Sequence, residues 1–166
     1  MLFRSLLVTL DVGFADRVEA ELDRQLASAA RRGILEQALG DHGCIVLVDS
    51  IDAGVEFVNA YGPEHLSVAL APALLEPTVA RLRNAGSIFV GPWAPESAGD
   101  YATGANHVLP TGGLARSCGP LAVEAFGKYS QVQRLSREGL AAIRGTVSTL
   151  AATEGLAAHR AAVEIR

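Results

Sequence analysis

The chain has 166 residues, of which 49% are apolar, so it is long enough to form one domain with a sizeable core. Its net charge is −4 and its 14 basic residues form no run, which argues against a nucleic-acid partner. No apolar stretch has the length of a membrane span and no signal peptide is evident at the start, so we expect a soluble cytoplasmic protein without a membrane partner. Cys44 and Cys118 lack the spacing of a metal site, which indicates buried or unremarkable thiols in a reducing compartment.

Four short apolar runs are predicted to be β-strands. They alternate with helical patterns, which is typical of βα units around a mostly parallel sheet. The run Cys44–Val48 is apolar at every position, as expected for a strand covered on both faces. We therefore expect an α/β domain with Rossmann-like βα units over residues 1–113. The four predicted strands cover residues 6–10, 44–48, 65–70 and 87–90.

Between these strands, apolar residues recur at helical spacing and form stripes that we expect to face a core. Asp49 or Ser50 is placed to cap the second helix, and a short helical turn is expected over residues 34–39. Pro77 falls in the first turn of the third helix, where proline is tolerated, and Gly86 follows as its stop. The stripes are Phe14, Val18, Leu22 and Leu26 on the first helix, Ile51, Val55, Val58 and Ala60 on the second, and Leu75, Val79 and Leu82 on the third, over 74–85.

Residues 91–113 form a long loop around which the rest of the chain is arranged. The loop has five glycines, three prolines, and no helical or alternating apolar period. Such long loops are mostly functional or disordered, and the apolar residues of this one favour order. It leaves the end of the fourth strand, where ligands bind in parallel sheets. We expect it to form the wall of a site with Glu96, Asp100, Asn106 and His107.

Residues 114–166 are predicted to form a helical tail. A short helix is expected over 120–126, and a short polar strand or an extended link over 131–135. Ser136 caps a long helix, which residues 154–165 continue or restart after Gly155. The tail has an apolar seam of its own, which commonly packs on a partner subunit. We therefore expect a homodimer in which the tail is exchanged between chains.

The pair Glu64–His65 is the first candidate for chemistry. It follows Gly62–Pro63 and opens a predicted strand, and at such a junction both side chains can reach one cleft. A neighbouring carboxylate and imidazole suit proton transfer near neutral pH. The alternative is a surface turn with two solvated side chains. His42, in a polar loop, is not expected to have a function.

Two further pairs contain histidine. Asp100 and His107, both on the long loop, are candidates for binding metal or substrate, although two ligands do not make a zinc site. Glu154 and His159 are five residues apart, so on one continuous helix they would not share a face, and a solvated helix face is the alternative. No dinucleotide or phosphate-binding glycine motif is present, so no cofactor-binding residue is assigned in this chain.

Three segments then carry a resemblance to a known family. GPEHL, AGSIFVGPWAPESAGDYATGANHVLPT and TLAATEGLAAHRAAV resemble the C-terminal part of histidinol dehydrogenase, in the same order, from about Leu6 to the end of the chain. The resemblance implies a zinc- and NAD-dependent enzyme of histidine biosynthesis. Such an enzyme oxidises L-histidinol to L-histidine through bound histidinal, and its tail contributes to the neighbouring subunit's site.

Site residues follow from the same resemblance. It implies that His65 is the general base and that Glu64 activates water in the second half-reaction. Asp100 and His159 match zinc ligands that also lie near the substrate. His107 and Glu154 match residues that line the substrate pocket.

The chain also departs from the family. The other two zinc ligands, in a QAEH-type segment, and the NAD-binding region belong to an N-terminal half that is absent here. The resemblance therefore implies a fragment, a shortened product or one piece of a split enzyme, with a separate N-terminal chain as partner and no activity alone. The rival interpretation is a non-catalytic dimerisation or regulatory module derived from that enzyme.

Overall fold

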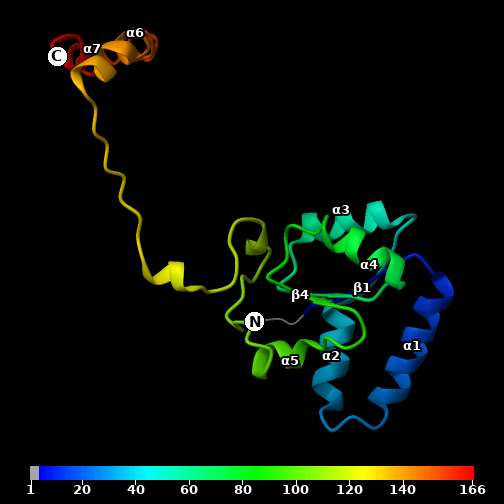
Figure 1. Cartoon of the computed structure of the whole chain (residues 1–166). Helices are drawn as coiled ribbons and strands as arrows, with labels where there is room; N and C mark the ends of the chain where they lie inside the picture. Colours follow the sequence, from blue (N-terminus) through cyan, green and yellow to red (C-terminus); the bar gives the residue numbers. More distant parts are fainter. Residues whose placement is uncertain (1–3) are drawn as a thin grey trace. The chain divides into compact units, whose positions relative to one another are not determined.

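The computed structural model describes residues 4–166, which form two compact units, one ending at Phe126 and the other covering Gly127–Arg166 (Figure 1). The contacts divide the chain after Phe126, whereas the sequence changes character after Gly113. The exchange of the tail between chains stays a prediction.

The first unit is a mixed α/β structure, which confirms the predicted fold class. Strand β1 pairs with β2 and strand β3 with β4, both parallel, with Leu6 opposite Cys44 and His65 opposite Ser87. The four strands form two two-stranded sheets rather than the single sheet expected. Figure 1 shows α3 and α4 on one side of the strands and α2 and α5 on the other. The elements are β1 Ser5–Thr9, α1 Val12–Leu26, α2 Arg32–His42, β2 Gly43–Leu47, α3 Ile51–Tyr61, β3 His65–Val68, α4 Pro72–Val79, β4 Ser87–Val90, α5 Glu96–Tyr101, and the 3-10 helices η1 Leu114–Arg116 and η2 Val123–Phe126.

Local signals set most of the helix starts. The Asp11 carboxylate accepts from the Phe14 N–H at 3.0 Å and begins α1, and the Ser50 hydroxyl accepts from the Ala53 N–H at 3.1 Å and begins α3. Pro72 begins α4, so Pro77 lies inside that helix and not in its first turn.

Two helices of this unit differ from the predicted ranges. Helix α2 runs over eleven residues where a single turn was predicted, and α4 ends at Val79, before the predicted stop. The segment 120–126 was predicted as a helix and forms only the short 3-10 helix η2.

Several apolar faces that were predicted to be buried are exposed. Strand β2 was expected to be covered on both faces, but Cys44 and Leu47 are exposed and no residue of the strand is buried. Phe14 and Leu22, from the predicted stripe of α1, are 42% and 37% exposed. An apolar run shows that a segment avoids water, but it does not show what covers it. Cys118 is exposed as well.

Helix α3 is tied to the segment before β4 by one buried amide. Asn59, 8% exposed, donates to the Arg81 carbonyl at 3.0 Å and accepts from the backbone N–H groups of Arg83 at 2.7 Å and Asn84 at 3.3 Å. Asn84 donates back to the Asn59 carbonyl at 2.7 Å. The buried residue at this end of α3 is therefore Asn59, while Ala60, predicted to be in the apolar stripe, is exposed.

The long loop contains a helix that its composition did not predict. Helix α5 packs so closely on β4 that a Cβ at Gly99 would lie 2.6 Å from Cε1 and 2.9 Å from Cζ of Phe89. Phe89 itself is 8% exposed. Glycine is therefore required here for the contact, and the helix is held by tertiary packing rather than by an apolar stripe of its own.

The second unit is a pair of helices, α6 Arg137–Thr153 and α7 Ala157–Glu164, which pack on each other. The Ser136 hydroxyl caps α6, accepting from the Gly139 N–H at 3.0 Å, as predicted. The chain restarts as α7 after Gly155, whose φ of 72° is left-handed. Residues 131–135 form an extended link and not a strand. In the part of the chain that the structure describes, no helix is long and apolar enough to cross a membrane.

We expect Asn59→Ala to lower the free energy of unfolding by about 1–3 kcal/mol, because it leaves buried backbone groups without partners. Urea unfolding followed by far-UV circular dichroism measures the change. Glu56→Ala, at an exposed position of the same helix, is the matched control and should change the free energy by less than about 0.5 kcal/mol. Equal effects of the two variants would show that the amide does not hold α3.

We expect Gly99→Ala to destabilise the first unit by about 1–3 kcal/mol, because the added methyl overlaps the Phe89 ring and α5 has to shift. The same urea measurement applies. Gly40→Ala in α2 is the control, since a Cβ there meets no atom within 4 Å and alanine raises helix stability by up to about 1 kcal/mol. A Gly99→Ala variant as stable as the wild type would contradict the close packing of α5.

Candidate functional site

The turn that precedes Glu64 and His65 is held by contacts with Gly113 and Arg116. Helix α3 ends at Gly62, whose φ is 65°, and a Cβ there would lie 3.1 Å from Cγ of Arg116 and 3.2 Å from the Gly113 carbonyl oxygen. The Arg116 guanidinium donates to the Ala60 carbonyl at 2.7 Å, at the carbonyl end of α3. Two contacts that are distant in sequence therefore define where the chain enters β3.

The backbone of the pair is held equally closely. The Gly86 and Ser87 N–H groups donate to the carbonyls of Pro63 and Glu64, both at 2.9 Å. A Cβ on Gly86 would lie 2.5 Å from the Glu64 oxygen and 3.0 Å from Cδ of Pro110. Glycine at this position therefore lets the end of the long loop approach the candidate pair.

His65 lies between an aromatic ring and a carboxylate. Its side chain is 26% exposed, and its ring stacks on Phe89 with centroids 6.2 Å apart and planes 21° apart. Its Nε2 lies 3.6 Å from Oε1 of Glu96, which is 53% exposed, and the two form an ion pair when the imidazole is protonated. Glu64, next to His65, is half-buried. Both residues of the pair are thus partly shielded from solvent, and their role in a site stays a prediction.

Glu96 was placed on the wall of the site by the sequence but was not assigned to His65. The sequence contains one relevant signal: Glu96 and Asp100 are four residues apart, so they share a face if the segment is helical. The segment has no apolar period, so a helix was not predicted there. Without the helix, the pairing could not be derived.

The contact between His65 and Glu96 lies at the amino end of β3, not beyond the carboxyl ends of the strands where it was expected. The reason is that the chain after β4 folds back as α5 against Phe89. His65 and Phe89 are diagonal neighbours on one face of the β3–β4 pair, so the site lies on that face.

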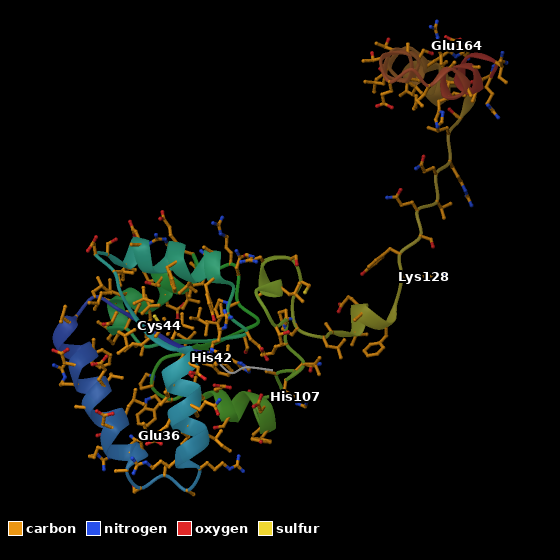
Figure 2. All side chains as sticks on the ribbon, turned by 180° about the vertical axis from the view of Figure 1, so that it is seen from behind. Glu36, His42, Cys44, His107, Lys128 and Glu164 are labelled. Carbon is orange, nitrogen blue, oxygen red and sulfur yellow. The ribbon has the colours of Figure 1, made fainter. Side chains whose placement is uncertain are left out.

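Asp100 and His107 lie on different parts of the segment 91–113, which was predicted to be a loop. Asp100 is half-buried on α5, and His107 is exposed (Figure 2). Asn106 fixes the segment beside His107, because its amide donates to the Leu121 carbonyl at 2.7 Å and accepts from the Val108 N–H at 2.8 Å. A surface depression borders this segment, lined by Val108, Leu109, Pro110, Cys118, Gly119, Pro120, Leu121, Ala122, Glu124 and Ala125.

Glu154 and His159 belong to the second unit. Glu154 ends α6 and His159 lies on α7, both exposed, with Gly155 between them. The rotation calculated for one continuous helix therefore does not apply. Asp100 and His159 belong to different compact units, so their pairing stays a prediction.

The predicted zinc site requires several His, Cys, Asp or Glu side chains close together. Among residues 4–166, no group of three or more His, Cys, Asp and Glu side chains is arranged to hold a metal ion. A structural or catalytic zinc needs at least three protein ligands. The described residues of one chain therefore do not fit zinc by themselves.

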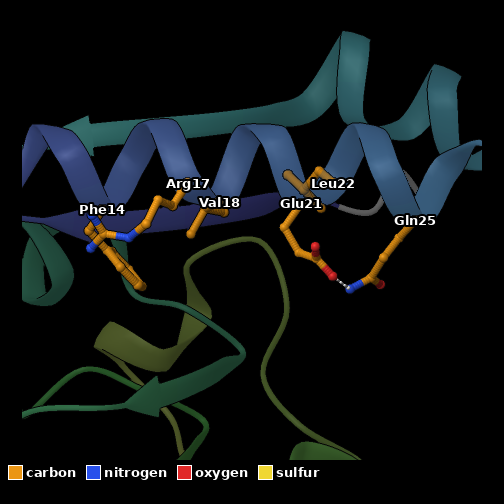
Figure 3. A pocket seen from close by; sticks show the side chains of 6 residues that line it. All are labelled: Phe14, Arg17, Val18, Glu21, Leu22 and Gln25. Atoms are coloured by element: carbon orange, nitrogen blue, oxygen red, sulfur yellow. Dashed lines mark hydrogen bonds between the residues drawn. The ribbon is translucent and has the colours of Figure 1, made fainter.

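A second surface depression lies on α1, and none of the predicted site residues lines it (Figure 3). It is lined by Phe14, Arg17, Val18, Glu21, Leu22 and Gln25. Hydrogen bonds from Arg24 and then Gln25 lower the pKa of Glu21 to about 2. Their stabilisation is therefore present above the ordinary value of 4.5 and is lost as the pH falls toward 2. The Glu21 carboxylate remains charged at neutral pH and is a poor proton acceptor, so this groove does not suit acid–base chemistry.

Comparison with known proteins agrees with the motifs. The family model for histidinol dehydrogenase matches residues 2–166. Histidinol dehydrogenases of Thermobifida fusca and Vibrio vulnificus are 50% and 48% identical over 98% and 96% of this chain. The crystal structure of histidinol dehydrogenase from Elizabethkingia anophelis superposes with a TM-score of 0.77 at 34% identity, over 96% of this chain and 36% of that one.

The chain spans 37% and 36% of the length of the two curated relatives. The relatives therefore contain a larger portion that this sequence does not match. The match nevertheless runs through both compact units and includes every predicted site residue. This chain belongs to the histidinol dehydrogenase family.

Proposed function

We propose that this chain supplies the acid–base part of an active site that oxidises L-histidinol to L-histidine through histidinal, with two NAD molecules as hydride acceptors. The observation that carries the proposal is the half-buried His65, held by Phe89 and Glu96 beside Glu64. An imidazole with restricted motion and limited solvent contact suits proton transfer at neutral pH. Family membership supplies the substrate class.

In the first half-reaction, His65 takes the proton of the substrate hydroxyl while the carbinol carbon loses hydride, and histidinal forms. In the second, Glu64 takes a proton from a water molecule that adds to the aldehyde. The deprotonated hydrate then transfers a second hydride to the second NAD and becomes the carboxylic acid, which releases its proton to solvent and leaves the carboxylate. Glu64 and His65 are adjacent residues at the start of β3, and in this proposal one bound substrate would contact both side chains.

The remaining predicted residues would bind substrate and metal. Asp100 is on the α5 face that carries Glu96, which supports a place near His65. His107 would line the substrate pocket. Glu154 and His159 would come from the second unit, and a homodimer with an exchanged tail would let them act on a neighbouring chain's site.

The chain would need the remaining portion of the relatives' length for activity. That portion would supply the missing zinc ligands and the NAD-binding region, either in a longer protein or in a separate N-terminal chain. We derive no catalytic step through zinc, because the ligands described here are incomplete. A cytoplasmic location fits a biosynthetic oxidoreductase.

The test follows the formation of NADH from L-histidinol by the absorbance of reduced nicotinamide. The chain is assayed with Zn²⁺ and NAD, alone and mixed with the portion of the Thermobifida fusca relative that it does not match. We expect activity in the mixture only. His65→Asn should reduce kcat by about 100-fold or more, the range of a lost general base. His42→Asn is the matched control and should retain full activity.

Three results would each contradict a part of the proposal. An active mixture whose rate is unchanged in His65→Asn would remove His65 from the chemistry. A mixture that assembles, shown by co-elution of the two parts, but forms no NADH would favour the rival function of a dimerisation or regulatory module. NADH formation by the chain alone would show that the other portion is not required.

A further inference from the structure

A carboxylate that the family resemblance did not assign contacts the proposed base. Glu96 Oε1 lies 3.6 Å from Nε2 of His65, which is beyond hydrogen-bond distance but within ion-pair distance. Glu96 is in the first turn of α5, and the structure describes no other salt bridge to His65 in residues 4–166. Among the described residues, Glu96 is the carboxylate that forms an ion pair with His65 when the imidazole gains a proton.

The position of Glu96 follows from packing and not from a flexible loop. Gly99, one turn further along α5, is in contact with the edge of the Phe89 ring, and it is itself buried. The same Phe89 ring stacks on His65. Phe89 of β4 is therefore a neighbour of both His65 and helix α5, which carries Glu96.

The ring of His65 has two neighbours as a result. The Phe89 ring stacks on the imidazole at a centroid distance of 6.2 Å, and Glu96 Oε1 lies 3.6 Å from its Nε2. A negative charge beside Nε2 favours the form of the ring that carries a proton on that nitrogen. After accepting a substrate proton, His65 carries a proton on both nitrogens, and Glu96 is the carboxylate that faces this imidazolium.

We propose that Glu96 is a positioning residue for His65: it orients the imidazole against Phe89 and stabilises the imidazolium that forms as the substrate hydroxyl loses its proton. This inference rests on the proposed function for its catalytic consequence, but not for the pairing itself. In the step concerned, the O–H bond breaks, an N–H bond forms on His65, and the hydride goes to NAD. Glu96 remains ionised and exchanges no proton.

Exposure sets the scale of the expected effect. Glu96 is 53% exposed, so water and salt screen its charge, and surface ion pairs contribute little to stability. Its effect should therefore appear in catalysis and in the state of the ring rather than in the free energy of unfolding. This separates a positioning residue from one that is merely structural.

The first arm of the experiment uses the chain alone and needs no activity. Nitrogen-15 NMR of a histidine-labelled sample reports which ring nitrogen of His65 carries the proton, with His65→Asn used to assign the signals. We expect the Nε2-protonated tautomer to dominate in the wild type. In Glu96→Ala the Nδ1-protonated form should increase. Glu56→Ala, at an exposed position of α3, should leave the ratio unchanged. An identical ratio in wild type and Glu96→Ala would overturn the pairing.

The second arm uses the mixture that forms NADH. Glu96→Gln keeps the shape of the side chain and removes its charge. We expect kcat to fall about tenfold with KM within about twofold of wild type, because general-base catalysis is worth roughly 100-fold or more and Glu96 supports only part of it. Glu96→Gln should cause no further loss in a His65→Asn background, which shows that it acts through His65.

The two arms separate the possible failures. A wild-type mixture that assembles but forms no NADH defeats the proposed function, and the NMR arm still decides whether Glu96 orients His65. An active mixture in which Glu96→Gln retains the full kcat overturns the inference while the proposed function survives. A rise in KM with unchanged kcat would assign Glu96 to substrate binding and would also overturn it.

Discussion

The close approach of helix α5 to strand β4 is the contact on which the candidate site depends. It exists because position 99 has no side chain, so that the backbone of α5 rests on the ring of Phe89. Phe89 in turn stacks on His65, and Glu96 on the same helix reaches the imidazole edge. Backbone contacts at Gly62 and Gly86 hold the other side of the arrangement. Three glycines therefore act at the points where segments distant in sequence have to meet.

The elements predicted well are those whose signals are local. Strands β1 to β4 were recognised as short apolar runs, and the caps at Ser50 and Ser136 begin the expected helices because a hydroxyl oxygen accepts from a nearby backbone N–H. Parallel pairing also followed, since alternating strands and helices require crossover connections. The residue pattern offered three carboxylate–histidine pairs as candidates, and the family motifs gave each of their residues a role.

What the sequence could not predict depends on contacts between distant residues. Helix α5 has no apolar period, and its existence depends on Phe89, which precedes it on β4. The assignment of Glu96 to His65 depends on that helix and was missed with it. Burial of β2 and α1 was overestimated, because an apolar run does not identify the surface that covers it. The buried role of Asn59 was missed since a polar residue in a helix is usually solvated.

We propose that His65, beside Phe89 and Glu96, is the group that contacts the substrate hydroxyl. A crystal structure of the chain assembled with the unmatched portion of the Thermobifida fusca relative, in the presence of L-histidinol, tests it most directly. We expect the histidinol hydroxyl within hydrogen-bond distance of the His65 ring, with Glu96 still beside Nε2. A substrate bound with its hydroxyl away from His65, or an imidazole turned away from Glu96, would contradict it.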